Sequence, residues 1–308
     1  MPQFAHARRP ALSGAALAAA AALLLSGCGG SGQADPGDPV KDARAKLPKA
    51  QRSAGALRVG MDVNYAPVEF RGPDGKPTGL DPDIAEALGR ILDVRIDLVD
   101  TPFDKLVPNL QAKQVDLVMS AFSDVRQRRE GLDETGKQVN PGVDFVDYFI
   151  AGTSIVVPKG NPKGIRTLDD LCGKTVALQQ ATTQDEIATR QVAVCARTGR
   201  QLTVHRLDTD AKALAEVASG AAVAGLNDFP VAAYAAKTTD GGNRFEVTGG
   251  QSTSSPYGIA VRKEDTDLRD TLAKAVDQLI RSGEYDKILA KWNVSAGAAQ
   301  NAVVNGGI

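Results

Sequence analysis

From Leu57 onward, short apolar runs alternate with segments in which apolar residues recur every three or four positions. The first kind of segment is typical of buried strands and the second of amphipathic helices. The first part of the chain predicts strands over 57–63, 94–100 and 115–122, with helices over 79–92 and 103–113. Asp81 is the predicted N-cap of the first helix, with Pro82 in its first turn. This alternation indicates an α/β fold with a mostly parallel sheet covered by helices.

A second round of the same pattern follows. It predicts strands over 175–180, 202–208 and 222–227 separated by helices, then a strand over 257–263 and a long helical stretch over 267–292 that divides near Gly283. We therefore expect two α/β lobes with a ligand cleft between them, joined by connections near 148–154 and 252–258. The expected boundaries are lobe I over 57–150 plus 253–295, lobe II over 151–252 and a C-terminal tail over 296–308. Such lobes can close on a ligand, which open α/β sheets hold at the carboxyl ends of their strands.

Residues 1–56 lie outside this pattern. Arg8 and Arg9 precede an uncharged apolar run of roughly 15 residues, which is typical of a secretory signal and shorter than the about 20 residues of a membrane span. The run ends in "LSGC", which resembles a bacterial lipobox and implies a signal peptide over 1–27 and lipidation of Cys28; the alternative is a plain signal with a chance cysteine. Residues 28–56 are rich in Gly, Pro, Ser and charge, so we expect a flexible tether.

Charge and cysteine content narrow the function classes. A net charge of -1 and 5% aromatic residues argue against nucleic-acid binding, which needs a basic face or stacking platforms. In an exported protein, Cys172 and Cys195 are expected to form a disulfide worth about 3 kcal/mol, with two buried thiols as the alternative. These cysteines and His205 lack the spacing of a metal site, so we expect no metal.

The stretch "VDLVMSAFSDVRQRREG" (115–131) changes abruptly from a buried strand to polar residues. It runs through Ser120 and Ser123 into three arginines, Arg126, Arg128 and Arg129. A solvated helix end explains such charge, but so does an anion site at the carboxyl end of a strand. Arginine binds a carboxylate through two parallel hydrogen bonds, which lysine cannot do.

Several segments in order resemble the family 3 extracellular solute-binding receptors of bacterial ABC importers. They include "LRVGMDVNYAPVEF", "GKPTGLDPDIAEALG", "FDKLVPNLQAKQVDLVMSAFSDVRQRRE", "LCGKTVALQQATTQDE", "NDFPVAAY" and "IRSGEYDKILAKW". The resemblance covers roughly 57–292 and rests on the order and spacing of all segments together. It implies the two-lobe periplasmic-binding-protein fold of type II, with two crossover strands.

The resemblance also implies a set of ligand-binding residues. They are Asp62, Tyr65, Phe103, Ser120, Ala121, Ser123, Arg128, Gln180, Thr182, Thr183, Gln184 and Asp228. Arg128 matches the arginine that holds the ligand α-carboxylate, while Thr182 and Thr183 stand at a helix N-terminus, which favours anions. One departure is Phe229, which stands where the family carries the acid that holds the ligand ammonium. Asp228 or Asp62 is expected to take that charge, unless the ligand lacks an α-ammonium.

The expected function follows from this resemblance. The protein would be a monomeric receptor on the extracytoplasmic face of the membrane, held there by its lipid. It would bind a polar amino acid, glutamine- or glutamate-like or basic, or a related carboxylate, and deliver it to an ABC permease without a cofactor. A ligand sensor and a dehydratase-like enzyme on the same fold are the alternatives, the latter using Glu69 or Asp62 as an acid.

Overall fold

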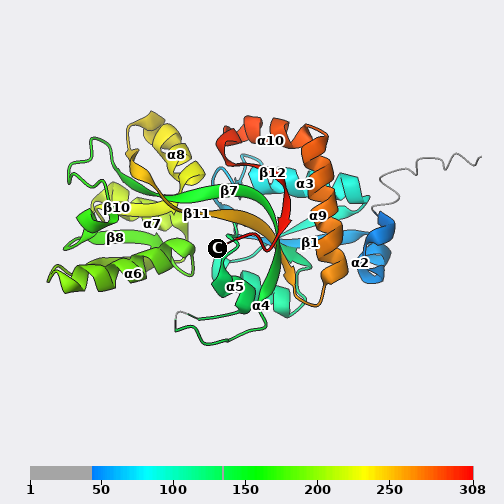
Figure 1. The fold of residues 1–308 in the computed structure, drawn as a ribbon. Helices are drawn as coiled ribbons and strands as arrows, with labels where there is room; N and C mark the ends of the chain where they lie inside the picture. Colours follow the sequence, from blue (N-terminus) through cyan, green and yellow to red (C-terminus); the bar gives the residue numbers. More distant parts are fainter. Residues whose placement is uncertain (1–43, 134, 308) are drawn as a thin grey trace, which may run out of the picture. The chain divides into compact units, whose positions relative to one another are not determined.

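The computed structural model describes residues 44–133 and 135–307 (Figure 1). The predicted signal peptide, Cys28 and most of the predicted tether lie outside these residues. The expected tether boundary at residue 56 is wrong, because helix α2 (Lys49–Ala54) precedes the first strand and the side chain of Leu47 is buried in the lobe I core. None of the described helices has the length and apolar character that a membrane span requires.

One mixed sheet carries both lobes, with strand order β5-β1-β6-β11-β7-β10-β8-β9 and with β12 added on β7. Its strands are β1 (Ala56–Met61), β5 (Arg95–Asp100), β6 (Leu117–Val118), β7 (Val143–Pro158), β8 (Thr175–Gln179), β9 (Thr203–Leu207), β10 (Ala224–Asp228), β11 (Phe245–Arg262) and β12 (Ala298–Val304). Strands β5, β1 and β6 are mutually parallel in lobe I, and β10, β8 and β9 are parallel in lobe II. The predicted α/β order is confirmed in both lobes.

The long antiparallel strands β7 and β11 run through both lobes and join them (Figure 1). Their pairing extends from Phe245 opposite Pro158 to Arg262 opposite Val143, with register shifts between 248 and 258. The predicted connections near 148–154 and 252–258 lie in the middle of these strands. Because bulges bend a strand pair, the two strands are irregular where the chain passes from one lobe to the other.

In lobe I the helices are α3 (Leu80–Leu92), α4 (Leu106–Gln111), α5 (Arg126–Glu130), α9 (Thr266–Arg281) and α10 (Glu284–Trp292). Helix α3 buries Leu80, Ile84 and Leu88 in the same core as Leu268 of α9, as its apolar period predicts. The predicted N-cap is wrong: Gly79 caps α3, and Asp81 lies inside the first turn with its side chain turned toward Ala121 and Tyr148. Gly283 separates α9 from α10, as predicted.

In lobe II the helices are α6 (Thr183–Arg197), α7 (Asp210–Ser219) and α8 (Phe229–Thr238). Cys172 and Cys195 form a disulfide that links the segment before β8 to α6 across 23 residues. Both cysteines are buried within the core that also contains Val176 and Leu178 of β8. The predicted disulfide is therefore present.

A small antiparallel sheet of β2 (Asn64–Tyr65), β3 (Glu69–Arg71) and β4 (Pro77–Thr78) follows β1. It places Phe70 edge-on against Trp292, with ring centroids 5.8 Å apart. The Phe70 ring also lies 6.2 Å from the ring of Tyr234 on α8. Since α8 belongs to lobe II, these aromatic rings form a contact between the lobes.

Candidate functional site

A cleft between the lobes is lined by residues that follow the carboxyl ends of strands, as expected for an open α/β sheet. Its lining consists of Asp62, Tyr65, Glu69, Phe103, Ala121, Ser123 and Arg128 from lobe I, and Gln179, Thr182, Thr183, Gln184 and Asp228 from lobe II. The structure thus brings together ten of the twelve predicted residues. Ser120 lies behind the wall, and Gln180 does not line the cleft.

The three arginines of α5 have three different environments. Arg126 is exposed and pairs with Glu130 one turn later at 2.9 Å. Arg129 turns away from the cleft and pairs with the buried carboxylate of Asp124 at 2.5 Å. Arg128 is the one that enters the cleft, in agreement with the predicted register.

Two aromatic rings and the two lobes surround the guanidinium of Arg128. It lies 4.1 Å from the ring centre of Phe122 and 5.4 Å from that of Phe103, which are cation–π distances. Its N–H groups donate to the carbonyl oxygen of Ser123 at 3.0 Å and to that of Ala181 in lobe II at 3.5 Å. Burial lowers the pKa of Arg128 to about 10, so the side chain stays charged at neutral pH. The guanidinium is therefore held in place for an anionic partner.

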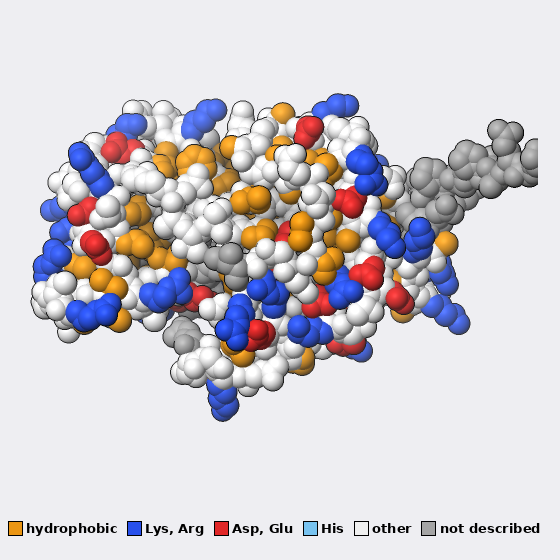
Figure 2. Space-filling view, in the orientation of Figure 1, with side chains coloured by type: hydrophobic (Ala, Val, Ile, Leu, Met, Phe, Trp, Pro, Cys, Tyr) orange, Lys and Arg blue, Asp and Glu red, His pale blue; other side chains and the backbone are white. Residues whose placement is uncertain are grey.

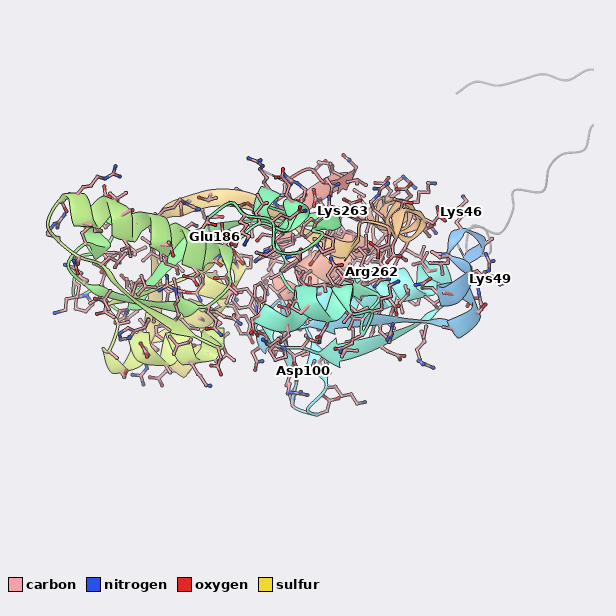
Figure 3. All side chains as sticks on the ribbon, turned by 90° about the horizontal axis from the view of Figure 1, so that it is seen from below. Lys46, Lys49, Asp100, Glu186, Arg262 and Lys263 are labelled. Carbon is pink, nitrogen blue, oxygen red and sulfur yellow. A yellow bond between two sulfur atoms is a disulfide. The ribbon has the colours of Figure 1, made fainter. Side chains whose placement is uncertain are left out.

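The N-terminus of α6 faces Arg128 from lobe II. Thr182 caps this helix by accepting the N–H of Asp185 at 3.2 Å, and Figure 3 shows the end that carries Glu186 directed toward lobe I. A helix N-terminus presents free N–H groups and the positive end of the dipole. Ala121 and Ala181 both have left-handed backbones, with φ of 45° and 61°. Such strain in a non-glycine residue is characteristic of binding sites.

Asp228 is the buried carboxylate on the lobe II wall. One of its oxygens accepts from the Gln184 amide at 2.8 Å, and the other accepts from the Tyr65 hydroxyl of lobe I at 3.1 Å. The Tyr65 oxygen in turn accepts the N–H of Asp228 at 2.9 Å. Burial raises the pKa of Asp228 to about 6. A cationic ligand group would stabilise its ionised form.

Asp62 faces the cleft from lobe I. Its carboxylate accepts from the Asn64 amide at 2.7 Å and from the Gln179 amide of lobe II at 2.7 Å. Burial raises the pKa of Asp62. The lobe II contact comes from Gln179 instead of the predicted Gln180, because alternate side chains of β8 point to opposite faces. This one-residue difference could have been read from the strand period.

Glu69 was not predicted as a ligand-binding residue, although it lines the cleft. Its Oε1 accepts the Ser120 hydroxyl at 3.2 Å, and this hydroxyl oxygen also accepts the N–H of Asp62 at 2.9 Å. Oε2 has no donor in reach, and burial together with the neighbouring charge of Asp81 raises the pKa of Glu69 well above its usual range. Asp81 is itself held by the N–H of Ala121 and the hydroxyl of Tyr148. Glu69 is thus a buried carboxyl group at the cleft wall, and its burial favours the protonated form.

Phe229 does not face the cleft. It lines a larger apolar groove beside α8, together with Ile150, Tyr234, Trp292 and Val294. Figure 2 shows apolar side chains gathered on this side of the molecule. Phe229 therefore does not occupy the place of a cleft acid, and Asp228 supplies the carboxylate there.

The cleft combines a positively charged end with several carboxyl groups. Arg128 and the start of α6 suit a carboxylate, whereas Asp228 and Asp62 suit cationic groups. Within 44–133 and 135–307, no group of three or more His, Cys, Asp and Glu side chains could hold a metal ion. This arrangement can bind a small zwitterion whose carboxylate and ammonium are held by opposite charges.

Comparison with known proteins defines the class. Residues 57–295 match the model of the bacterial extracellular solute-binding proteins, family 3, and the chain belongs to this family. It is 30% identical to the arginine-binding protein ArgT of Corynebacterium glutamicum over 271 residues, which cover 87% of this chain and 84% of that protein.

Two solved structures share the fold. An ancestral arginine-binding protein bound to arginine is 32% identical, with a TM-score of 0.68 over 77% of this chain and 98% of that one. The ancestral amino acid-binding protein AncCDT-1, a precursor of cyclohexadienyl dehydratase, is 33% identical, with a TM-score of 0.68 over 79% of this chain and 97% of that one. The two-lobe type II fold implied by the sequence is confirmed.

Proposed function

We propose that this protein is the extracytoplasmic receptor of an ABC importer for an amino acid with a basic side chain. The α-carboxylate would pair with Arg128 and the N–H groups at the start of α6. The α-ammonium would pair with Asp228, and the side chain would extend along Phe103 toward Asp62 and Glu69. All of these residues line the same cleft.

The balance of charge in the cleft carries this proposal. Three carboxyl groups, those of Asp62, Glu69 and Asp228, meet the single guanidinium of Arg128. A neutral amino acid uses one positive and one negative partner, which leaves the carboxylate of Asp62 without a counter-charge, whereas burial favours the protonated form of Glu69. A second cation on the ligand supplies that counter-charge, and charge pairing inside a closed cleft discriminates strongly between ligands. The arginine-binding relatives support the same assignment.

A dehydratase is the second candidate, because Glu69 is a carboxyl group of the cleft lining whose pKa is raised by burial. A general acid of this kind is what the elimination of water from a cyclohexadienyl ring requires. AncCDT-1, which this chain resembles, is an amino acid-binding protein and a precursor of cyclohexadienyl dehydratase, so binding and dehydration both occur on this fold. Incubation with a cyclohexadienyl acid, followed by the absorbance of an aromatic product, tests this candidate, and we expect no turnover.

We further propose that Cys28 is lipidated after removal of residues 1–27 and holds the receptor, as a monomer, beside its permease. The support is the "LSGC" sequence, which lies outside the described residues. In cells, the wild-type protein should partition with membranes and take up a labelled fatty acid. Cys28→Ser should abolish the label, and equal labelling of this variant would contradict lipidation.

Co-purification of a permease would favour import, and that of a sensor kinase would favour a sensor.

The central test is a thermal-shift and calorimetric screen of residues 44–308 against arginine, lysine, histidine, glutamine, glutamate and cystine. A ligand at a thousand times its Kd stabilises the folded state by about 4 kcal/mol, which for a domain of this size raises the Tm by on the order of 10 °C. We expect the largest shift with arginine or lysine. A shift with glutamate or glutamine and none with the basic amino acids would overturn the charge argument.

Single substitutions test which residues bind the α-carboxylate of the ligand and which bind its side chain. Arg128→Ala should abolish binding of every amino acid, and Arg126→Ala is its matched control, because Arg126 pairs outside the cleft. Asp62→Asn should weaken the basic ligand and leave the binding of neutral amino acids little changed. Equal losses for Arg126→Ala and Arg128→Ala would contradict the assignment of the carboxylate site.

A further inference from the structure

The C-terminal residues were predicted to be a tail, but the structure shows that they belong to lobe I. After α10 the chain forms β12, which pairs with β7 from Ala298 opposite Phe149 to Val304 opposite Val146. Figure 1 shows β12 crossing lobe I and the chain end marked near α5. The three residues after β12, Asn305, Gly306 and Gly307, are called the anchor segment below.

Each residue of the anchor segment has its own partner on lobe I. The Asn305 side chain accepts the N–H of Phe145 at 2.8 Å and donates to Asp144 at 3.1 Å. The N–H of Gly306 donates to Asp147 Oδ2 at 3.0 Å, and the N–H of Gly307 donates to Asp124 Oδ2 at 2.9 Å. Hydrogen bonds to carboxylates are among the stronger ones in proteins. Three consecutive anchors define one path for the chain.

Glycine is required where this path meets Asp124. A Cβ atom at Gly307 would collide with the carbonyl carbon and oxygen of Asp124, and one at Gly306 would crowd Val303 and the Asp147 carboxylate. The obstacle at Gly307 is backbone, which cannot move aside as a flexible side chain can. The two glycines therefore permit a close approach.

Asp124 connects the anchor segment to the ligand site. It is fully buried and follows Ser123, whose carbonyl oxygen accepts from Arg128. Its other oxygen accepts from Arg129 of α5, and its N–H donates to Pro256 of β11. The turn that carries Ser123 and the helix that carries Arg128 are thus both tied to one carboxylate.

Asp147 completes the arrangement. Burial and the nearby Asp124 raise the pKa of Asp147 to about 7, while Arg129 opposes this change. Two adjacent buried acids repel each other once both are ionised. The N–H groups of Gly306 and Gly307 and the guanidinium of Arg129 offset this repulsion. Removal of the anchor segment therefore takes one hydrogen-bond donor away from Asp147 and one from Asp124.

We infer that the anchor segment is a positioning element for ligand binding. It holds Asp124 in place, and Asp124 in turn holds the turn at Ser123 and the start of α5, from which Arg128 binds the ligand carboxylate. The inference rests on the proposed function in so far as Arg128 holds that carboxylate. Loss of the anchor at Asp124 should weaken ligand binding about tenfold, the change that corresponds to one charge-assisted hydrogen bond.

The experiment compares the wild-type protein with a chain that stops after Val304 and with Gly307→Ala. Calorimetry gives the Kd for arginine at 25 °C, and hydrogen exchange reports on the backbone amides of 124–129. Both variants should bind arginine about tenfold more weakly and exchange faster in this segment. If the shortened chain fails to fold, Gly307→Ala carries the same comparison.

Two controls separate positioning from general loss of stability. Asn301→Ala changes an exposed residue of β12 whose side-chain amide donates to the neighbouring carbonyl of Ala302, so it should behave like the wild-type protein. Ile84→Val weakens the lobe I core at α3 and should lower the Tm without changing the Kd or the exchange of 124–129. Unchanged exchange of 124–129 in the anchor variants, or an equal increase in Ile84→Val, would overturn the inference. If the wild-type protein binds no basic amino acid, the proposed function fails, and exchange alone decides the role of the anchor segment.

Discussion

Side-chain environment, more than residue type, decides what the arginines of α5 do. Arg126 and Glu130 are one turn apart and pair in solvent, where an ion pair contributes little. Arg129 neutralises Asp124 behind the cleft. Arg128 alone of the three lies against Phe103 and Phe122 in the cleft. The sequence alone predicts that an arginine lies here. The selection of Arg128 from the three arginines depended on its matching position in the family.

Arg128→Lys should weaken ligand binding by roughly 10- to 100-fold. Lysine keeps the charge but loses the planar fork and the stacking on two rings, each of which contributes about 1–2 kcal/mol in a desolvated site. Titration calorimetry with the ligand identified by the screen measures the change. Arg126→Lys is the control and should bind normally; a normal Kd for Arg128→Lys would mean that charge alone suffices.

Ligand affinity should fall as the pH is lowered through 6. Asp228 has a raised pKa of about 6, and only its ionised form attracts an ammonium group, so protons compete with the ligand. One unit below this pKa, the Kd should be about tenfold weaker than at pH 8. Calorimetry between pH 5 and pH 8 would show this trend and the release of protons on binding near pH 6. An affinity that is flat or improves at low pH would exclude Asp228 as the ammonium partner.

At the scale of elements, long periodic segments were predicted well and the cleft edges were not. The start of α6 at Thr182 and Thr183 and the division of the C-terminal helices at Gly283 were both predicted. The predicted strand over 115–122 shrinks to β6, because the chain turns away at the left-handed Ala121 to form the cleft wall. The joining strands were read as connections, because Gly249, Gly250 and the serines over 252–255 favour loops, and this segment becomes strand through pairing with β7.

The disulfide of lobe II should stabilise the fold without affecting the ligand site. Closure of a loop of 23 residues contributes about 3 kcal/mol in the chain-entropy model. Replacement of both cysteines by alanine should therefore lower the free energy of unfolding by about this amount, measured in urea. The Kd should stay unchanged, because Cys172 and Cys195 lie in the lobe II core away from the cleft lining. A changed Kd with unchanged stability would contradict this separation.

At the scale of the whole molecule, contacts between the lobes bury carboxyl groups of the cleft. Asp62 meets Gln179, and Tyr65 meets Asp228 across the boundary. Burial raises the pKa of Asp81 and Asp228 to about 6 and that of Asp147 and Asp210 to about 7. Such groups disfavour the folded state once they ionise, unless a cation neutralises them. The sequence cannot predict them, because their burial depends on contacts made in the folded and closed protein.

The unliganded protein should therefore be more stable at pH 5 than at pH 8. With folded-state pKa values above the unfolded value near 3.8, the folded state binds more protons in this window, so stability falls as the pH rises through 6 and 7. We expect the Tm to drop by on the order of 5 °C between pH 5 and pH 8. Asp147→Asn should make the fall of the Tm with pH less steep. A bound basic ligand should reverse the contribution of Asp228 to this fall, because its cation stabilises the ionised carboxylate. A Tm that rises with pH in the absence of ligand would contradict this prediction.

The chain contains one tryptophan, Trp292, and its surroundings give it a practical use. Its indole N–H donates to Asp83 at 2.7 Å, and its ring touches Phe70, which in turn reaches Tyr234 of lobe II. Movement of the lobes would change the polarity around this single indole, which lies outside the ligand cleft. The protein thus carries an intrinsic optical reporter whose emission can follow opening and closing in real time, without a label and without contact with the ligand.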